Sequence, residues 1–351
     1  MLNTRTVNIE RPMKYYLSIV FLLFSSMSFI VNAESENRAF ASFAFENDVF
    51  LGDDGLYSNG LFITWGYNDI KGLDKQSLPS WIAYLAQQTH LSSNDISTSN
   101  KQYAVSYGFG HLLQTSIDFS VAELVEEDAP YVGLLAWDVN LLAYDEVVSD
   151  EVGLILGAVG PMVGGKHVQY YVHDWIGSSE PKGWDNQINN ELVFRAQARR
   201  TLRLYETEVT SSFLNGEFDF LAGVDGGVGN LRSDIATGIG MRFGRDLKRN
   251  FSSATVFPVQ KFNGFHASPY GWNLFLNLSA SYVANDIFIN GNTFSDSHSV
   301  ELIHPQAAIS MGFMANIYDV SILFTLLHMT DEYEGQAEAT QFGSIAFTYH
   351  F

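Results

Sequence analysis

A glutamine and a histidine stand four residues apart in the segment VQYYVHDWIG, residues 168–177. The segment follows a Gly-Gly pair and ends in a glycine, a pattern that predicts a short helix with Gly177 as its C-cap. Because residues four apart lie on one helix face, Gln169 and His173 are expected to point the same way. Histidine is the side chain best suited to general-base catalysis near neutral pH, although a surface histidine of a loop would show the same spacing.

A second polar group occurs in FENDVFLGDDGLYSNG, residues 45–60. Asn47 and Asp48 follow a strand-like run, and Ser58 opens the next one. Carboxylate and amide oxygens on a loop are the ligands that a hard cation such as Ca²⁺ prefers. The spacing is not that of an EF-hand, and an acidic, solvated loop is the alternative interpretation. VEEDAP, residues 125–130, is a weaker cation candidate of the same kind.

The segments around these groups alternate between apolar and polar residues, which predicts β-strands of about ten residues. Their polar face is made of small side chains, a pattern typical of the lumen of a membrane barrel whose apolar face meets lipid. A soluble β-sandwich would also alternate, but its strands average about 5–6 residues. The clearest examples are GLFITWGYN (60–68), QYAVSYGFG (102–110), EFDFLAGVDGG (217–227) and GWNLFLNLSASY (271–282).

Both ends of the chain carry further signals. GSIAFTYHF, residues 343–351, alternates up to a final phenylalanine, as the closing strand of bacterial outer-membrane barrels does. Residues 13–33 combine a basic start, an apolar run and a small-residue end, which predicts a signal peptide cleaved after Ala33. The shortness of the apolar run disfavours the alternative, a transmembrane helix. We therefore expect a signal peptide over 1–33 and a single barrel domain over 34–351.

The composition excludes several kinds of site. The 351-residue chain has a formal net charge of −20 and no cysteine. Nucleic acid is an unsuitable partner, because phosphate neutralisation needs clustered lysines and arginines. A chain without cysteine has neither a thiolate metal site nor a thiol nucleophile. The absence of cysteine also suits a compartment in which stray thiols are oxidised.

The alternation predicts an all-β fold, a transmembrane antiparallel β-barrel of about twelve strands, and an even count places both termini on one side. Two connections on that side, 69–100 and 246–271, are longer than the turns usual there. Inside the first, LPSWIAYLAQQ (78–88) is expected to form a short helix under the barrel. The expected strands are 38–46, 58–69, 101–111, 131–143, 151–159, 191–204, 217–227, 236–246, 271–284, 300–316, 318–329 and 341–351.

Strand parity brings the two polar groups together. If both termini lie in the periplasm, the odd-numbered connections face outward, and these carry every candidate residue named above together with Gln187 and Glu191. An acid, a base and amide groups at one rim form a possible hydrolytic site that faces outer-leaflet lipid. His167 is a nearby rival to His173. Three further histidines have no assigned role, namely His111, His298 and His304.

Two segments carry a family resemblance. ENDVFLGDDGLYSNG (46–60) and LGAVGPMVGGKHVQYYVHDWIGSSEPKGWDNQINNE (156–191) resemble the outer-membrane lipid A 3′-O-deacylases. TDEYEGQ…FGSIAFTYHF (330–351) and GVGN (227–230) are also similar to that family. The resemblance spans nearly the whole chain after the signal peptide, and the GP…GG…Q…H…GWDNQ run is its most specific part.

The resemblance implies a twelve-stranded barrel that removes the acyloxyacyl group at the 3′ position of lipid A and depends on Ca²⁺. Asn47 and Asp48 match the family's Asn-Asp after the first strand, and Ser58 stands where members have a threonine or serine. Gln169 and His173 match the Gln and His of the helix, Gln169 as a positioning or polarising partner. His173 would deprotonate a water that attacks the ester carbonyl, and a metal held partly by Asp48 would stabilise the oxyanion.

Two positions depart from the family pattern. Some members carry a lysine in the second outward segment that is thought to help bind the oxyanion, whereas residues 111–131 contain neither lysine nor arginine. An acidic residue shortly after the histidine also contributes to the family's metal site. Here the register offers Ser179 with Glu180 beside it, so Glu180 is the expected second metal ligand.

Two other functions fit parts of the sequence. YSNG, residues 57–60, resembles the Ser-Asn-Gly of barrel phospholipases A, but that enzyme type needs a histidine two residues before the serine, where this chain has Leu56. A non-catalytic barrel, such as a porin, an adhesin or an assembly protein, would explain the strands and the acidic loops. It would not explain why the polar motifs coincide at the outer rim.

Overall fold

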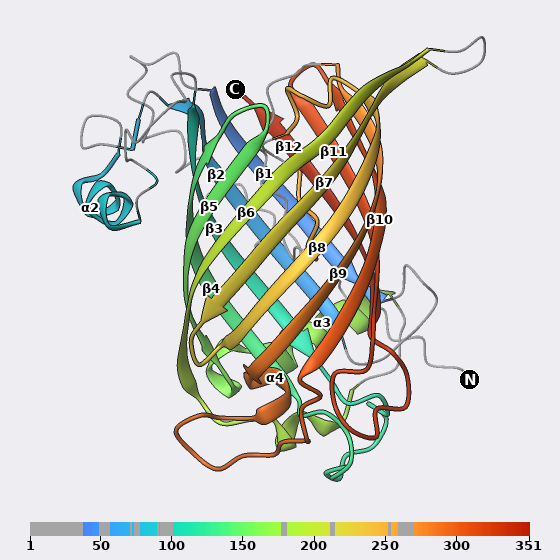
Figure 1. Ribbon diagram of the computed structural model, residues 1–351. Coiled ribbons are helices and arrows are strands. Elements are labelled where there is room, and N and C mark those ends of the chain that lie inside the picture. Colours follow the sequence, from blue (N-terminus) through green and yellow to red (C-terminus); the bar gives the residue numbers. More distant parts are fainter. Residues whose placement is uncertain are drawn as a thin grey trace, which may run out of the picture. The chain divides into compact units, whose positions relative to one another are not determined.

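Twelve antiparallel strands close into a barrel in the described part of the chain (Figure 1). The computed structural model describes residues 38–48, 57–70, 72–73, 78–89, 91, 101–176, 181–210, 215–251, 254–258 and 270–351. The strands are β1 Arg38–Asn47, β2 Tyr57–Ile70, β3 Gln102–Gln114, β4 Val132–Tyr144, β5 Val148–Val159, β6 Glu191–Thr210, β7 Asn215–Val228, β8 Arg232–Arg245, β9 Trp272–Asp286, β10 Pro305–Ile317, β11 Val320–Met329 and β12 Gln341–His350. Each strand pairs with its chain neighbours, and β1 pairs with β12. The predicted barrel is therefore confirmed, while the expected signal peptide, residues 1–33, lies outside the described residues.

The barrel has two ends, which carry different helices and turns (Figure 1). One, which we call the α3 end, carries helix α3 (Gly165–Ile176), helix α4 (Ile287–Asn290) and the 3-10 turns η2 (Pro161–Val163) and η3 (Gly183–Asn186). The other, the α2 end, carries helix α2 (Ser80–Gln88), the start of β1 and the end of β12. Every helix in the described part of the chain is too short or too polar to cross a bilayer.

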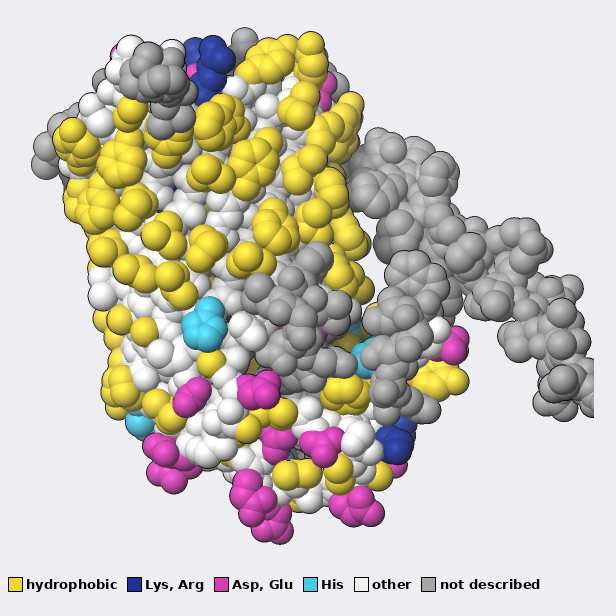
Figure 2. Space-filling view, turned by 90° about the vertical axis from the view of Figure 1, so that its right-hand side faces the viewer, with side chains coloured by type: hydrophobic (Ala, Val, Ile, Leu, Met, Phe, Trp, Pro, Cys, Tyr) yellow, Lys and Arg dark blue, Asp and Glu magenta, His cyan; other side chains and the backbone are white. Residues whose placement is uncertain are grey.

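Apolar side chains cover the outer face of the wall. Alternate residues of β9 and β10 are exposed there, for example Leu274, Leu278, Met311 and Phe313. Figure 2 shows such side chains as a broad band, whereas Asp and Glu gather toward the α3 end. An apolar outer band around a polar lumen is the pattern of a barrel that spans a membrane.

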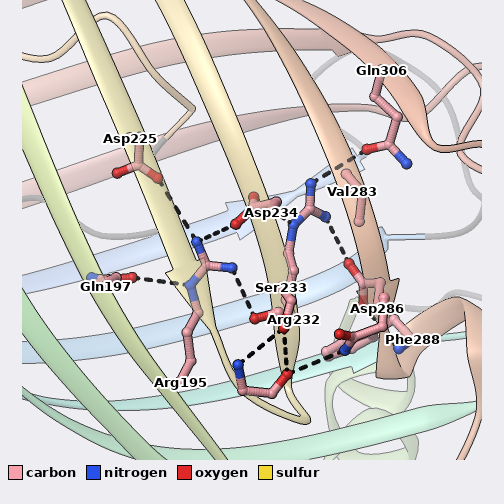
Figure 3. Close-up of polar contacts among 12 residues, drawn as sticks. Arg195, Gln197, Asp225, Arg232, Ser233, Asp234, Val283, Asp286, Phe288 and Gln306 are labelled. Atoms are coloured by element: carbon pink, nitrogen blue, oxygen red, sulfur yellow. Dashed lines mark hydrogen bonds and ion pairs between the residues drawn. The ribbon is translucent and has the colours of Figure 1, made fainter.

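The lumen is polar, and its charges are paired (Figure 3). Arg195 of β6 forms an ion pair with Asp234 of β8, with 2.7 Å between nitrogen and oxygen. Arg232 forms another with Asp286 of β9, also at 2.7 Å. Because a charge taken out of water is costly unless it is paired, these contacts make a charged lumen tolerable. They border a chamber of about 310 Å³.

The long connection after β8 folds back into the lumen. Phe251 and Val256 are buried there in one cluster with β7. The guanidinium carbon of Arg203 lies 4.5 Å from the centre of the Phe251 ring, a cation–π contact. This part of the connection, residues 246–251 and 254–258, is called the plug below. Its length has a structural reason, since it fills part of the lumen instead of making a turn.

The other long connection carries α2, which packs on the outside of the wall. Ile82, Ala83 and Ala86 are buried in a cluster with Val139 and Leu141 of β4. These β4 residues alternate with lumen-lining ones, so they belong to the outer face. The expected helix is confirmed, but its expected position under the barrel was wrong. Burial against the apolar wall removes more apolar surface from water than a position below the opening would.

Most expected strand boundaries differ from the structure by a few residues, and two differ more. β10 begins at Pro305, later than expected, because Val300 and Leu302 pack into a loop cluster at the α3 end. β6 continues to Thr210, later than expected, as a hairpin with β7 that extends beyond the last β5 pairing at Leu202. At the start of β10, apolar residues buried in a loop produce the same sequence pattern as a strand. At the end of β6, the strand has no buried face, so its sequence lacks the alternating pattern.

We expect Phe251→Ala to destabilise the barrel by about 3–5 kcal/mol, because it removes a fully buried ring and the partner of the Arg203 guanidinium. The measurement is the urea midpoint of the protein in lipid vesicles, followed by heat-modifiable migration on gels. The matched control is Phe294→Ala, whose ring is 76% exposed, and it should keep the wild-type midpoint. Equal midpoints for the two variants would show that the plug does not stabilise the barrel.

Candidate active site

Helix α3 follows β5 through a tight turn. The turn η2 ends at Gly164, whose φ of 74° lies in the left-handed region that favours glycine. Gly165 then starts α3 where a side chain has no room, since a Cβ would lie 2.8 Å from the Trp184 ring and 2.9 Å from Leu113. The Gly-Gly pair therefore turns the chain and brings the helix against the barrel.

Helix α3 lies on the outer face of the wall and not over the lumen. Leu113 of β3 stands between two lumen-lining residues and therefore faces outward. It is buried together with Trp184, and Val168 of α3 packs against this cluster. Gly133 of β4 also lets the chain approach, because a Cβ there would lie 2.8 Å from Val163. Anything that meets the exposed side of α3 does so from outside the barrel.

Gln169 is nearly buried and is held by Trp184 of η3. Trp184 Nε1 donates a hydrogen bond of 2.7 Å to Gln169 Oε1. The Trp184 ring meets Tyr131 edge to face, with 5.2 Å between ring centres. Burial raises the pKa of Tyr131 to about 12. The GWDNQ motif contains Trp184, but the sequence pattern assigned it no role, because the bond joins residues fifteen positions apart.

His173 lies one turn after Gln169 and is half-buried. Phe119 from the β3–β4 connection packs edge-on against its imidazole, with 6.2 Å between ring centres and 88° between ring planes. That connection contains no lysine or arginine. It places an aromatic ring beside the candidate base. The rival His167 is exposed on the same helix.

The end of β1 lies at the same end of the barrel as α3. β1 ends at Asn47, and the next residue, Asp48, is buried. β2 separates β1 from β3, and its Asn59 pairs with Leu113, the wall residue beneath α3. Neighbouring strands lie about 4.8 Å apart, so the end of β1 is on the order of 10 Å from this wall position.

The structure describes Ser58 by its backbone. The pairing of β2 with β3 shifts register between Tyr57 and Asn59, so the strand ladder is irregular at Ser58. Glu180 and the neighbouring Ser179 lie outside the described residues, so Glu180 stays a prediction. The expected site residues that the structure brings to the α3 end are Asn47, Asp48, Gln169 and His173.

Three further histidines at this end, His111, His298 and His304, hold parts of the fold together. Each contacts a backbone carbonyl, to which the ring N–H donates: His111 to Val163 at 3.2 Å, His298 to Asp128 at 2.7 Å and His304 to Val283 at 2.6 Å. Each of these bonds engages one ring nitrogen and holds a loop or a strand end in place.

Two acidic residues at the rim anchor loops. Asp128 of the VEEDAP segment accepts hydrogen bonds of 2.7 Å from the Ile117 and Ala129 amides and the Tyr333 hydroxyl. Glu191 accepts hydrogen bonds of 3.0 Å from the Asn230 side chain and the Thr293 amide. Their oxygens already have donors, which favours a structural role for both over metal binding.

The described residues provide part of a site for a hard cation. Within them, no group of three histidine, aspartate or glutamate side chains could hold a metal ion. Asp48 and Asn47 have the carboxylate and amide oxygens that suit Ca²⁺. A complete shell needs further oxygens from outside the described residues, such as the expected Glu180, so the Ca²⁺ site stays a prediction.

Comparison with known proteins decides the family. The family model described as outer membrane protein LpxR matches residues 17–351. The chain belongs to the LpxR family. It is therefore a bacterial outer-membrane protein, and the family resemblance predicted from the sequence motifs is confirmed. The α3 helix and the end of β1 are thus parts of an LpxR-family barrel.

The fold is shared with a solved member of the LpxR family. LpxR from Salmonella typhimurium is similar over 89% of this chain and 100% of that chain, with a TM-score of 0.70 and 17% sequence identity. The β domain of the Bordetella autotransporter BrkA covers 90% of this chain and 99% of its own, with a TM-score of 0.42 and 9% identity. No curated protein sequence matches the chain.

A half-buried acid in the loops of the α3 end, Glu332, should make stability depend on pH. Burial raises the pKa of the Glu332 carboxyl, although Thr340 donates to it at 2.6 Å. The folded state then keeps a proton that the unfolded chain releases above about pH 4.3. The stabilisation that Glu332 contributes should therefore be complete below that pH and be lost as pH rises through the raised pKa.

Glu332→Gln should flatten this fall between pH 4 and pH 8, because glutamine has no proton to lose. The measurement is again the urea midpoint in lipid vesicles. Glu334→Gln is the matched control, since Glu334 is an exposed acid in the same loop. A Glu332→Gln profile that runs parallel to the wild type would contradict the prediction.

Proposed function

We propose that this protein is an outer-membrane lipid A 3′-O-deacylase, an esterase that hydrolyses the 3′-acyloxyacyl ester of lipid A. Membership of the LpxR family supports the proposal. The observation that carries it is the position of α3, which holds a histidine against the lipid-facing side of the barrel wall. A base in that position meets a substrate that lies in the membrane.

The substrate class follows from the orientation of the barrel. Bacterial barrels keep their shorter turns and termini in the periplasm, and in this proposal the α3 end therefore faces the cell exterior. The outer leaflet beside that end consists of lipopolysaccharide, whose lipid A carries ester-linked acyl chains. The lumen is a poorer route to the site, because it holds the plug and paired charges in the described part of the chain.

His173 is the general base of the proposed reaction. A ring nitrogen takes a proton from water while the water oxygen attacks the ester carbonyl. The bond between the acyl carbon and the sugar oxygen then breaks, and the imidazolium returns the proton to that oxygen. The products are a free acyloxyacyl acid and a free 3′-hydroxyl on the sugar.

Ca²⁺ is the proposed cofactor. Asp48 and Glu180 would hold it, and such an ion supplies positive charge that stabilises an oxyanion. Asn47 and Ser58 are proposed to line the same site, because β1 and β2 present them at the end of the barrel that carries α3.

We expect His173→Ala to abolish the loss of the 3′-acyloxyacyl mass from lipid A. General-base catalysis contributes about 10²–10⁴-fold, so the rate should fall by at least that factor. The measurement is mass spectrometry of lipid A extracted from outer membranes that contain the protein, with and without a Ca²⁺ chelator. His167→Ala is the matched control, since this exposed histidine lies on the same helix, and it should keep wild-type activity.

The same experiment separates the competing functions. Unchanged lipid A together with fatty acid released from phospholipid would identify a phospholipase. No change in either lipid would identify a non-catalytic barrel. If lipid A still loses its 3′-acyloxyacyl group when Ca²⁺ is chelated, the role of Ca²⁺ is contradicted. The assignment as a deacylase would then still hold.

A further inference from the structure

The bond between Trp184 and Gln169 fixes which way the Gln169 amide faces. The indole N–H of Trp184 can only donate, so the atom that meets it at 2.7 Å must be the Gln169 carbonyl oxygen. The indole is itself held by Tyr131, which packs edge-on against it, and Gly183 packs directly against the Tyr131 ring. The amide nitrogen of Gln169 is thereby directed away from Trp184.

That nitrogen carries two N–H groups, and the side-chain hydrogen bond found for Gln169 among the described residues is the one that its oxygen accepts. The side chain is 3% exposed. An N–H group that the protein itself does not engage is available to a ligand that supplies an acceptor. The carbonyl oxygen is taken by Trp184, so Gln169 does not position the attacking water by accepting from it. The N–H groups of the Gln169 amide remain available to donate a hydrogen bond.

We infer that Gln169 donates a hydrogen bond to the oxyanion in addition to the proposed Ca²⁺, and that Trp184 is the positioning residue that aims it. The inference rests on the proposed function and assigns a role within it. In ester hydrolysis the new acceptor is the carbonyl oxygen as it becomes an oxyanion, and His173 lies one helical turn from Gln169. The β3–β4 connection supplies no lysine or arginine for this purpose, and it places Phe119 beside the base.

Two substitutions at one position separate donation from packing. Gln169→Glu keeps an oxygen for the Trp184 N–H but has no N–H to give, whereas Gln169→Met loses both. Both variants should lose about 10²–10³-fold in kcat with little change in KM, the loss expected for one oxyanion donor. Trp184→Phe should lose less in kcat, because this change releases the Gln169 amide from its fixed orientation but leaves the amide in the site. The assay is deacylation of lipid A in mixed micelles, with barrel closure checked by heat-modifiable migration.

The outcomes are distinct. If Gln169 only supports Trp184, Gln169→Glu will keep wild-type kcat while Gln169→Met loses it, and the inferred role is then wrong. The pH profile of kcat in Gln169→Met should keep the wild-type midpoint, because the base is untouched; a shifted midpoint would mean that Gln169 acts through His173. A wild type without activity on lipid A overturns the proposed function and this role together.

Helix α2 has one face buried against the wall and one exposed aromatic face. Its inner face buries wall residues that otherwise meet lipid, including Val139 and Leu141. Its outer face exposes Trp81 and Tyr84, which are 49% and 60% exposed, and the helix contains no charged residue. The Trp81 ring lies 6.1 Å from that of Trp137 on the wall, so this face continues the apolar band of the barrel.

We propose that the outer face of α2 is covered by the phospholipid leaflet at the α2 end of the barrel. Trp and Tyr favour the boundary between headgroups and acyl chains, and an uncharged helix with these residues suits that position. The continuity of this face with the lipid-facing wall selects lipid as the occupant over water or a second copy of the chain.

The absence of cysteine allows a direct test. A nitroxide attached to Tyr84→Cys, in vesicles of phosphatidylethanolamine and phosphatidylglycerol, should collide with oxygen more than with a water-soluble nickel chelate. Leu274→Cys on the wall is the lipid-facing control, and Phe294→Cys is the exposed loop control, being 52% and 76% exposed. Accessibility equal to that of Phe294→Cys would overturn the proposal, and so would dipolar broadening between labels on two copies.

Discussion

Closure of the sheet between β1 and β12 is the constraint on which the other features depend. Inside a bilayer every backbone N–H and C=O must find a partner within the protein, and a barrel achieves this only when its first and last strands pair. Closure then fixes which residues face inward, because side chains alternate strictly along each strand. Charges that face inward are withdrawn from bulk water and need partners, as Arg195 and Arg232 have in Asp234 and Asp286. The plug fills more of the same space.

The outer wall is the surface where the protein meets its lipid surroundings, and both α2 and α3 are docked on it. Each docking site replaces lipid contacts by small residues that permit close approach. Gly133 and Gly165 have this function under α3, and Ala83 and Ala86 face the wall from α2. The helices differ in polarity, because α3 carries His173 and Gln169 whereas the exposed face of α2 is aromatic. The proposed catalytic groups are thus concentrated at one end of a wall that is otherwise apolar.

The strands could be predicted from the sequence because a two-residue period repeats along the chain and turn residues separate the segments. The helix with Gln169 and His173 could also be predicted, since its spacing is local. Its docking on the outer wall could not, because that depends on which residues of β3 and β4 face outward and lack bulk. Trp184 was missed for a related reason: its bond to Gln169 joins two elements that only the folded chain brings together. Val300 and Leu302 misled the strand assignment because burial in a loop cluster produces the same alternation as burial in a sheet.

Charge explains why an uncharged donor suits this site. The chain has a net charge of −20, and its acidic side chains gather at the α3 end (Figure 2). The proposed substrate, lipid A, is itself phosphorylated, so its approach to this end would depend on cations that lie between like charges. A lysine beside His173 would be drawn to the acidic loops and the lipid phosphates as well as to an oxyanion. The Gln169 amide has no net charge, and its direction is set by a hydrogen bond to a packed indole rather than by a long-range field. A neutral donor therefore keeps its orientation in an environment where competing charges are abundant.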